Sequence, residues 1–148
     1  MTMAAEPHLD DDALPIVSES PQAIVGASGL LVGVATRVVS VADVAVLIVP
    51  APGGSRIGEH RLHVRLAREL ARRGIPSMRF DAGDGGDSVA DAGSSAFYDD
   101  DVVAAARHLL TLQPDAFVAL LAAGNAAVGA ARSWNALIRA AVPLSALC

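Results

Sequence analysis

Two apolar runs with a helical pattern between them form the most regular stretch of the sequence. The first run, 46–49, leads into a Pro/Gly turn at 50–54. Leucines then recur at every fourth position across 62–70, on one face of a helix whose other face carries arginines. Gly74 occupies the position of a left-handed C-cap, and the second apolar run, 75–80, follows it. The pattern predicts a βαβ unit with parallel strands and a right-handed crossover.

The flanking segments predict a hairpin before this unit and further helices and strands after it. Runs of Val, Ile and Leu broken by glycines are typical of two antiparallel strands. Three aspartates open a 3.6-residue period that predicts a helix, and a continuous apolar run then predicts a buried parallel strand. The expected elements are strands near 22–26 and 30–40, a helix from 99 to before Pro114, a strand at 117–121, a helix to about Trp134 and a last strand at 137–147. Residues 1–20 are expected to be an acidic, mobile tail, and 21–148 a single domain.

Composition narrows the class of protein. The chain is 53% hydrophobic and 18% charged, which favours a folded domain over a disordered chain. A net charge of −5 gives no general electrostatic reason to bind nucleic acid or anionic lipid. Cys148 is the single cysteine, so one chain cannot build a disulfide framework or a cysteine zinc site. The N-terminus lacks a basic signal region, and the apolar stretch 116–131 is shorter than the ~20 residues that a spanning helix needs. We therefore expect a soluble, bacterial, cytoplasmic protein.

The sequence motifs of the central stretch resemble those of a known protein family. Residues 74–88 read G-I-P-S-M-R-F-D-A-G-D-G-G-D-S, and they follow the pair Gly53-Gly54 and the sequence Gly58-x-His60-Arg61. Together these motifs resemble the exosortase A system-associated hydrolases of the α/β-hydrolase superfamily. The resemblance spans about 22–147. It implies a truncated α/β-hydrolase-like three-layer sandwich, with a mostly parallel sheet and an N-terminal hairpin, that ends after about the sixth strand.

In this fold the nucleophile lies on a sharp turn between a strand and a helix, flanked by small residues. The corresponding segment here is Ala-Ala-Gly-Asn-Ala at 122–126, so the position of the nucleophile is Gly124, which has no reactive side chain. No Asp, Glu or His follows Asn125, although the fold takes its acid and its histidine from later positions. No catalytic residue is therefore assigned, and Ser88 and Ser133 are the candidates for a displaced serine.

The resemblance also implies an oxyanion hole built from backbone N–H groups. The donors would come from the turn at Gly53 and Gly54 and from Asn125, which follows the elbow. Asp81 and Asp87 belong to an acidic glycine loop after a parallel strand, where α/β folds place binding loops. They are candidates for ligand contact, and the alternative is a solvated turn.

Neither a metal nor another cofactor is expected. His60 and His63 have a spacing that some metal sites use, but no third ligand lies convincingly beside them, so we expect a structural role. The aspartates at 99–101 suit a helix N-terminus better than a metal. The acidic glycine loop lacks the ligand order of a calcium loop. The glycines after the first apolar run match neither nucleotide-binding motif.

The leading hypothesis is a non-catalytic protein that acts through binding or as a scaffold. A sheet that ends early leaves an apolar edge, which a homodimer or a partner protein would cover. A small acyl compound is the candidate ligand. The alternative is an esterase- or thioesterase-like hydrolase that uses a displaced serine or is completed by another chain. A third hypothesis is a fragment of a degraded gene.

Overall fold

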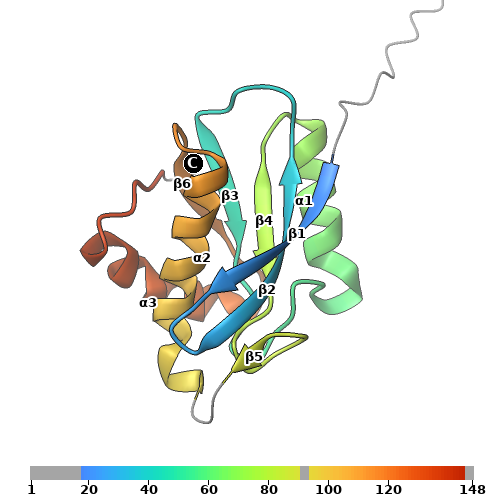
Figure 1. Cartoon of the computed structure of the whole chain (residues 1–148). Helices are drawn as coiled ribbons and strands as arrows, with labels where there is room; N and C mark the ends of the chain where they lie inside the picture. Colours follow the sequence, from blue (N-terminus) through green and yellow to red (C-terminus); the bar gives the residue numbers. More distant parts are fainter. Residues whose placement is uncertain (1–17, 91–93, 146–148) are drawn as a thin grey trace, which may run out of the picture.

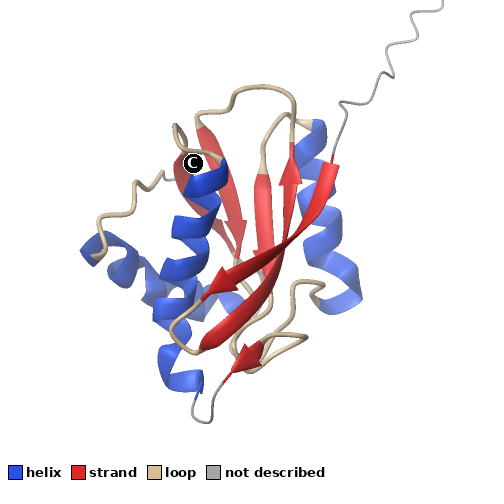
Figure 2. Cartoon of the chain, in the orientation of Figure 1, coloured by secondary structure: helices blue, strands red, loops and turns tan. Residues whose placement is uncertain are grey.

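The computed structural model describes residues 18–90 and 94–145 and places a mixed sheet between two layers of helices (Figures 1 and 2). The α/β prediction is therefore confirmed. The strands are β1 (Ser18–Val25), β2 (Gly29–Arg37), β3 (Val44–Ile48), β4 (Ser77–Phe80), β5 (Val89–Ala90) and β6 (Phe117–Leu121). The helices are α1 (Leu62–Arg72), α2 (Tyr98–Leu112) and α3 (Ala126–Arg139), with short 3-10 helices η1 (Glu59–Arg61) and η2 (Ser94–Phe97).

The strand order β1-β2-β4-β3-β6 places β3 at the centre of the parallel part of the sheet. β3 pairs in parallel with β4 and with β6, so the predicted βαβ unit β3-α1-β4 is confirmed. β1, β2 and β4 pair antiparallel, and the short β5 pairs with β2. Beyond β6, Leu144 forms a parallel bridge to Val118. β1 is an edge strand, and Pro21 lies within it.

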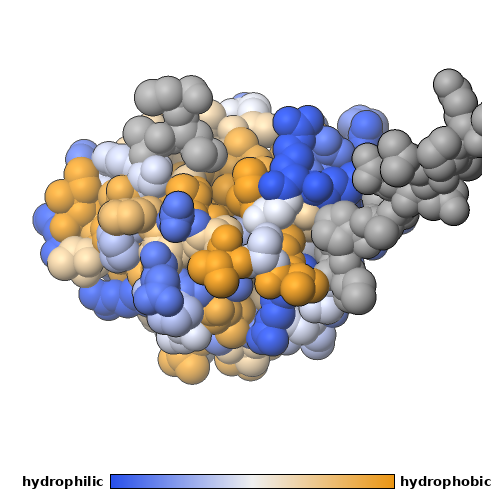
Figure 3. All heavy atoms as spheres, turned by 90° about the horizontal axis from the view of Figure 1, so that it is seen from above, coloured by the Kyte–Doolittle hydropathy of each residue, from blue (hydrophilic) through white to orange (hydrophobic). Residues whose placement is uncertain are grey.

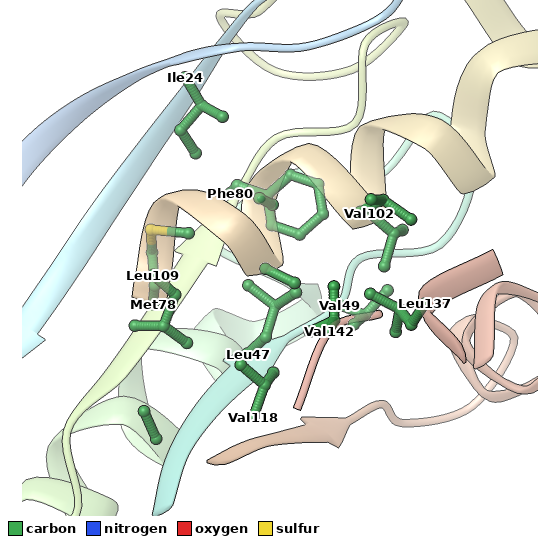
Figure 4. Close-up of a cluster of buried hydrophobic side chains, with 14 of the residues drawn as sticks. Ile24, Leu47, Val49, Met78, Phe80, Val102, Leu109, Val118, Leu137 and Val142 are labelled. Atoms are coloured by element: carbon green, nitrogen blue, oxygen red, sulfur yellow. The ribbon is translucent and has the colours of Figure 1, made fainter. Parts of the chain in front are cut away.

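The two faces of the sheet are covered unequally. α2 and α3 cover one face and α1 covers the other (Figure 1). The larger core lies under α2 and α3, where Leu47, Met78 and Phe80 of the sheet meet Val102 and Leu109 of α2 (Figure 4). The smaller core joins α1 to β3 and β6 through residues that are almost completely buried, namely Val46, Ile48, Ala67 and Ala119. At roughly 25 cal/mol per Å² of buried apolar surface, both cores stabilise the sheet, the larger one more.

Several expected boundaries were wrong. The hairpin strands run over 18–25 and 29–37, so residues 18–20 belong to β1 and not to the tail. α3 continues past Trp134 to Arg139, where a strand was expected from 137. Within the described part of that segment, which ends at residue 145, Leu144 forms a bridge to the sheet. Residues 1–17 and 146–148 lie outside the described part of the chain.

The predicted capping residues agree with the structure at the end of α1 and only in part at the start of α2. Gly74 has a φ of 74° and donates to the Ala71 carbonyl, which confirms the left-handed C-cap of α1. Asp99, Asp100 and Asp101 lie in the first turn of α2, where the macrodipole favours them, but α2 begins at Tyr98 and has no side-chain cap. Asp101 instead receives hydrogen bonds from the Ser28 amide and hydroxyl at the turn of the β1–β2 hairpin.

Among the described residues, no helix combines the length and the apolar character that crossing a membrane requires. The same residues contain no group of three His, Cys, Asp or Glu side chains placed to hold a metal ion.

Candidate functional site

A cleft of about 480 Å³ opens at the carboxyl ends of β3 and β6. Its walls come from the turn after β3, the start of α1 and the turn that leads into α3. The lining residues are Pro50, Ala51, Gly54, Ser55, Gly58, Glu59, Leu62, His63, Ala123, Gly124, Asn125 and Ala126. None of them is an arginine, and Glu59 is the one carboxylate among them. The cleft thus combines apolar side chains with backbone groups and with the polar side chains of Ser55, Glu59, His63 and Asn125.

Gly124 lies at the tip of the turn between β6 and α3. Its φ of 59° is in the left-handed region that side chains rarely adopt. A Cβ added at Gly124 would meet no atom within 4 Å, although Cβ atoms added at most other glycines of the chain would collide with neighbours. The backbone therefore has the bend of an elbow, and there is open space where a side chain would stand.

Several backbone N–H groups of the cleft have no acceptor within the described part of the chain. The amides of Ala51 and Asn125 donate no hydrogen bond there, and the same is true of the amides of Ser55, Ala123 and Gly124. The predicted donors of the turn after β3 are both used within the protein, because Gly53 donates to Asp84 Oδ1 at 2.9 Å and Gly54 donates to the Ala51 carbonyl at 2.7 Å. Asn125, a predicted donor, and Ala51, which was not among the predicted donors, both line the cleft.

Arg56 holds the turn after β3 against the acidic glycine loop. Its guanidinium pairs with Asp81, which is 0% exposed, and with Asp87 at 2.8 Å. Asp81 also accepts hydrogen bonds from the backbone N–H of Arg56 at 2.6 Å and of Asp87 at 2.7 Å. These carboxylates raise the pKa of Arg56 further above its ordinary value. Asp81 and Asp87, the candidates for ligand contact, thus fix the loop beside the cleft and are not among its lining residues.

Tyr98 fixes the other end of the same turn. Its hydroxyl donates a 2.6 Å hydrogen bond to the carbonyl of Pro50, the residue before Ala51. Burial raises the pKa of Tyr98 to about 12, so the hydroxyl keeps its proton at any physiological pH. The Ala51 amide is therefore held between two constraints, Tyr98 on one side and Arg56 on the other.

His63 is the titratable imidazole of the cleft. It is 7% exposed, and its Nδ1 lies 3.2 Å from the Ser55 carbonyl. Burial lowers the pKa of His63, so the ring is neutral at pH 7 and donates from Nδ1 to that carbonyl. Nε2 then carries the lone pair. His60, in contrast, is exposed in η1 with a φ of 50°, so the two histidines do not share one helix face.

Neither serine candidate lines the cleft. Ser88 Oγ accepts from the Val32 amide and donates to the Asp81 carbonyl, at 2.9 and 3.1 Å. Ser133 is 0% exposed and donates to Asp99 Oδ1 at 2.8 Å between α3 and α2. Both hydroxyls therefore have structural partners, and the structure places no histidine against them among its described contacts.

Sequence reasoning singled out the elbow but missed most of the wall facing it. The sequence did not point to Ala51 or Ser55, because each contributes a backbone group to the site. The geometry of the turn decides whether that backbone group can make a contact. His63 appeared only as one half of a histidine pair. The left-handed residues Gly58, His60 and Arg61, with φ values of 70°, 50° and 61°, mark this wall as conformationally unusual.

Solved structures resemble the chain although its sequence finds no match. No protein-family model and no curated protein matches it. A lidless α/β serine hydrolase from Xanthomonas campestris superimposes with a TM-score of 0.66 at 21% identity, over 82% of this chain and 57% of the other. An α/β serine hydrolase homologue from Coxiella burnetii gives 0.63 at 20%, over 83% and 59%. A Pyrococcus furiosus esterase gives 0.63 at 19%, over 79% and 44%.

The chain thus spans about half the length of these solved structures. The likeness, at such identities, concerns the fold. The strand order around β3, the bend at Gly124 and the position of the cleft agree with it. The chain has the α/β-hydrolase fold.

Proposed function

We propose that the chain is a non-catalytic protein of the α/β-hydrolase fold that binds a small acyl compound in the cleft. The observation that carries the proposal is Gly124, whose backbone bends as a nucleophile elbow does while the space above it stays open. An acyl group fits this position because the Ala51 and Asn125 amides can donate to its carbonyl oxygen. With no hydroxyl or thiol at the elbow, the bound compound keeps its acyl bond.

The charge of the cleft favours an uncharged ligand over a free acid. No cationic side chain lines it, and Glu59 would repel a carboxylate at its mouth. Leu62 at the start of α1, and Ala123 and Ala126 at the turn into α3, offer apolar surface to a short acyl chain. An ester, thioester or amide with a small acyl group therefore fits better than the corresponding anion.

The test combines binding and turnover on the purified chain. Calorimetry with a short-chain ester, the matching amide and the matching acid should give binding of the first two and weaker binding of the acid. A fluorophosphonate probe and a nitrophenyl ester should give neither labelling nor turnover. Labelling that disappears in Ser88→Ala or Ser133→Ala would overturn the proposal.

A matched pair of variants at one residue examines the backbone donor. Asn125 has a φ of −63°, which proline adopts, so Asn125→Pro removes one N–H without bending the chain. Asn125→Ala keeps that N–H and removes only the side chain. We expect ester binding to weaken about tenfold in Asn125→Pro, the loss of one hydrogen bond of ~1.4 kcal/mol, and to persist in Asn125→Ala.

The second candidate is a hydrolase completed by another chain, and His63 is the observation that favours it. A neutral imidazole with a free Nε2 in a cleft is a candidate general base for a nucleophile that a partner supplies. Esterase activity that appears only on mixing with a partner protein, and that His63→Gln abolishes, would support it. The homodimer or partner that would cover the sheet stays a prediction, and sedimentation over a range of concentrations tests it.

A further inference from the structure

α1 covers only part of its side of the sheet. Ala67 of α1 packs on Val46 and Ile48 of β3 and on Ala119 of β6. β1 and β2 lie at the other end of the strand order, beyond β4. In the described part of the chain, the core that α1 forms contains no residue of β1, β2 or β5. On this side, these three strands therefore lack the apolar cover that α1 gives to the rest of the sheet.

Two contacts show which side chains of β1 point to the side of α1. The Gln22 side chain lies 2.9 Å from His108 of α2, and the Glu19 carboxylate lies 3.1 Å from Arg68 of α1. Since side chains alternate along a strand, the odd-numbered residues of β1 share the side of α1. Their partners on β2 and β5 follow from the strand register. The exposed or half-buried apolar residues on this side, which we call the hairpin face, are Pro21, Ala23, Val25, Leu30, Val32 and Val89.

The hairpin face is a continuous apolar surface across three strands. Val25 is directly opposite Leu30, and Leu30 is directly opposite Val89. These three side chains are 85%, 46% and 69% exposed. A continuous apolar surface of this kind marks an interaction site, whereas single exposed apolar side chains are ordinary.

A stripe of arginines runs along α1 beside the hairpin face. Arg61, Arg65, Arg68 and Arg72 follow at i, i+4, i+7 and i+11, so they share one face of the helix. The first three, which we call the arginine stripe, border β1, because Arg68 reaches Glu19 on that strand. Figure 3 shows strongly hydrophilic residues gathered on the side of the molecule where α1 lies.

The charge between the arginine stripe and the hairpin face is not balanced. The Glu19 carboxylate lies 3.1 Å from Arg68 and 3.8 Å from Arg79, and the hydrogen bond from Arg68 lowers the pKa of Glu19. Arg61 adds to this effect. Among the described residues, Arg61 and Arg65 have no ion-pair partner. Further carboxylates would therefore be stabilised at this border.

The dimensions of this surface fit one helix. β1 and β2 together span about 10 Å across the sheet, and an α-helix with its side chains is about 10–12 Å wide. A helix on the hairpin face would have α1 as its neighbour, and packed helices lie about 8–10 Å apart. One flank of that helix would then meet the arginine stripe.

Two other occupants fit this surface less well. α1 stands above the hairpin face by about one helix diameter, so a flat lipid surface in contact with α1 would not reach Val25 or Val89. A second copy would have to offer an apolar surface together with carboxylates. The described helices do not, because α3 contains no Asp or Glu and the buried apolar side chains of α2 lie in the larger core.

We propose that the hairpin face and the arginine stripe together bind an amphipathic helix of a partner protein, with carboxylates along one flank. The apolar side of that helix covers Val25, Leu30 and Val89, and its carboxylates pair with Arg61 and Arg65. Each exposed ion pair contributes little and is screened by salt. The apolar surface therefore supplies most of the affinity, and the charges decide which helices are accepted. No residue of the hairpin face lines the cleft, so the proposal is independent of acyl binding there.

Binding of a synthetic peptide to the full chain tests the proposal. The probe is a peptide of about 15 residues with leucines at i, i+3, i+4 and i+7 and glutamates along one flank. Its control has glutamines in place of the glutamates. Fluorescence anisotropy at low salt should show the acidic peptide binding about fivefold more tightly, the effect of two exposed ion pairs, and high salt should remove the difference. Equal binding of the two peptides at low salt, or no binding of either, overturns the proposal.

Matched variants at exposed valines test the apolar contact. Val25→Thr, Val89→Thr keeps the shape of both side chains but removes apolar surface, and should weaken binding of the acidic peptide about tenfold. Val39→Thr, Val41→Thr makes the same change at valines that are 77% and 93% exposed outside the hairpin face, and should leave binding unchanged. Amide spectra check that each variant is folded. Unchanged binding in the first double variant overturns the proposal.

Matched variants at arginines test the charges. Arg61→Gln, Arg65→Gln should remove the preference for the acidic peptide over its control. Arg37→Gln, Arg139→Gln changes two exposed arginines elsewhere and should keep that preference. A preference that survives the first double variant contradicts the acidic partner.

The other occupants give distinct results. Phosphatidylserine vesicles that bind the protein, and that release it in Val25→Thr, Val89→Thr, would assign the surface to lipid. A dimer in sedimentation of the protein alone, dissociated by the same double variant, would assign it to a second copy. Either result overturns the proposal.

Discussion

The Tyr98 hydroxyl donates a 2.6 Å hydrogen bond to the Pro50 carbonyl across 48 residues of sequence. The bond ties the first residue of α2 to the turn that follows β3, and so to the Ala51 amide in the cleft. Tyr98→Phe removes only this hydroxyl and leaves the Pro50 carbonyl without its partner. We expect a loss of about 1 kcal/mol in the free energy of unfolding and weaker ligand binding. Urea denaturation and calorimetry measure the two effects, and unchanged values in both would refute the positioning role.

Alkaline pH should destabilise the protein through the same residue. The pKa of Tyr98 is raised from 10 to about 12, so the folded state keeps a proton that the unfolded state releases. The contribution of Tyr98 to the free energy of unfolding is therefore fully present below pH 10, and it is lost as the pH rises through about 12. Tyr98 is the single tyrosine, so tyrosinate absorbance reports it alone. An ordinary titration midpoint in the folded protein would contradict this environment.

Alanine substitutions at two left-handed glycines should distinguish the free-energy cost of backbone strain from the cost of a steric clash. Gly124 and Gly86 have φ values of 59° and 54°, but a Cβ at Gly86 would lie 2.3 Å from the Asp81 carboxylate. Alanine at either position costs about 1 kcal/mol of strain. We expect Gly86→Ala to cost ~1–3 kcal/mol more, because it also displaces Asp81 from Arg56. Equal losses in urea denaturation would show that the space above Gly124 is closed.

The two carboxylates on Arg56 should differ sharply in their effect on stability. Asp81 is 0% exposed, so Asp81→Asn leaves a guanidinium beside a neutral group and costs ~3–5 kcal/mol. Asp87 is 72% exposed, and Asp87→Asn should cost less than ~1 kcal/mol. Thermal or urea unfolding of both variants checks the ranking. A reversed order would mean that the loop is held from its exposed side.

Mild acid should weaken the fold through His63, which is buried, and His108, which is half-buried. Burial lowers the pKa values of His63 and His108, so protons bind the unfolded state first as the pH falls below about 6.5. Stability is therefore full above that pH and declines as the pH falls toward the lower folded pKa values. His63→Gln and His108→Gln should each flatten the decline between about pH 7 and about pH 5. If neither variant flattens it, carboxylates cause the loss.

The central βαβ unit could be predicted because its signals are local. The leucines of α1, the Gly74 cap and the apolar runs of β3 and β4 each act within a few residues. The end of α3 was misplaced for the opposite reason. Alanine and leucine continue from 136 to 147 with no turn residue before Pro143, so the sequence pattern alone does not separate a helix that ends at Arg139 from a strand that begins at 137.

In the candidate site, too, local features could be predicted from the sequence, and contacts between distant residues could not. The elbow at Gly124 follows a strand directly, so its place was predictable. The pairs Arg56–Asp81 and Tyr98–Pro50 join residues 25 and 48 positions apart, and only the folded chain brings them together. Whether the Ala51 amide is free to bind a ligand depends on the hydrogen bonds that the turn after β3 makes. The residue types in that turn do not indicate those hydrogen bonds.

Pro21 has a consequence for the behaviour of the protein at high concentration. It lies in β1, the strand at one open edge of the sheet, and it has no N–H to offer to a strand from another molecule. At the opposite edge, the backbone of 143–145 already bonds to Val118. Each margin of the described sheet therefore has one position that is closed to strand-to-strand pairing, Pro21 in β1 and Val118 in β6.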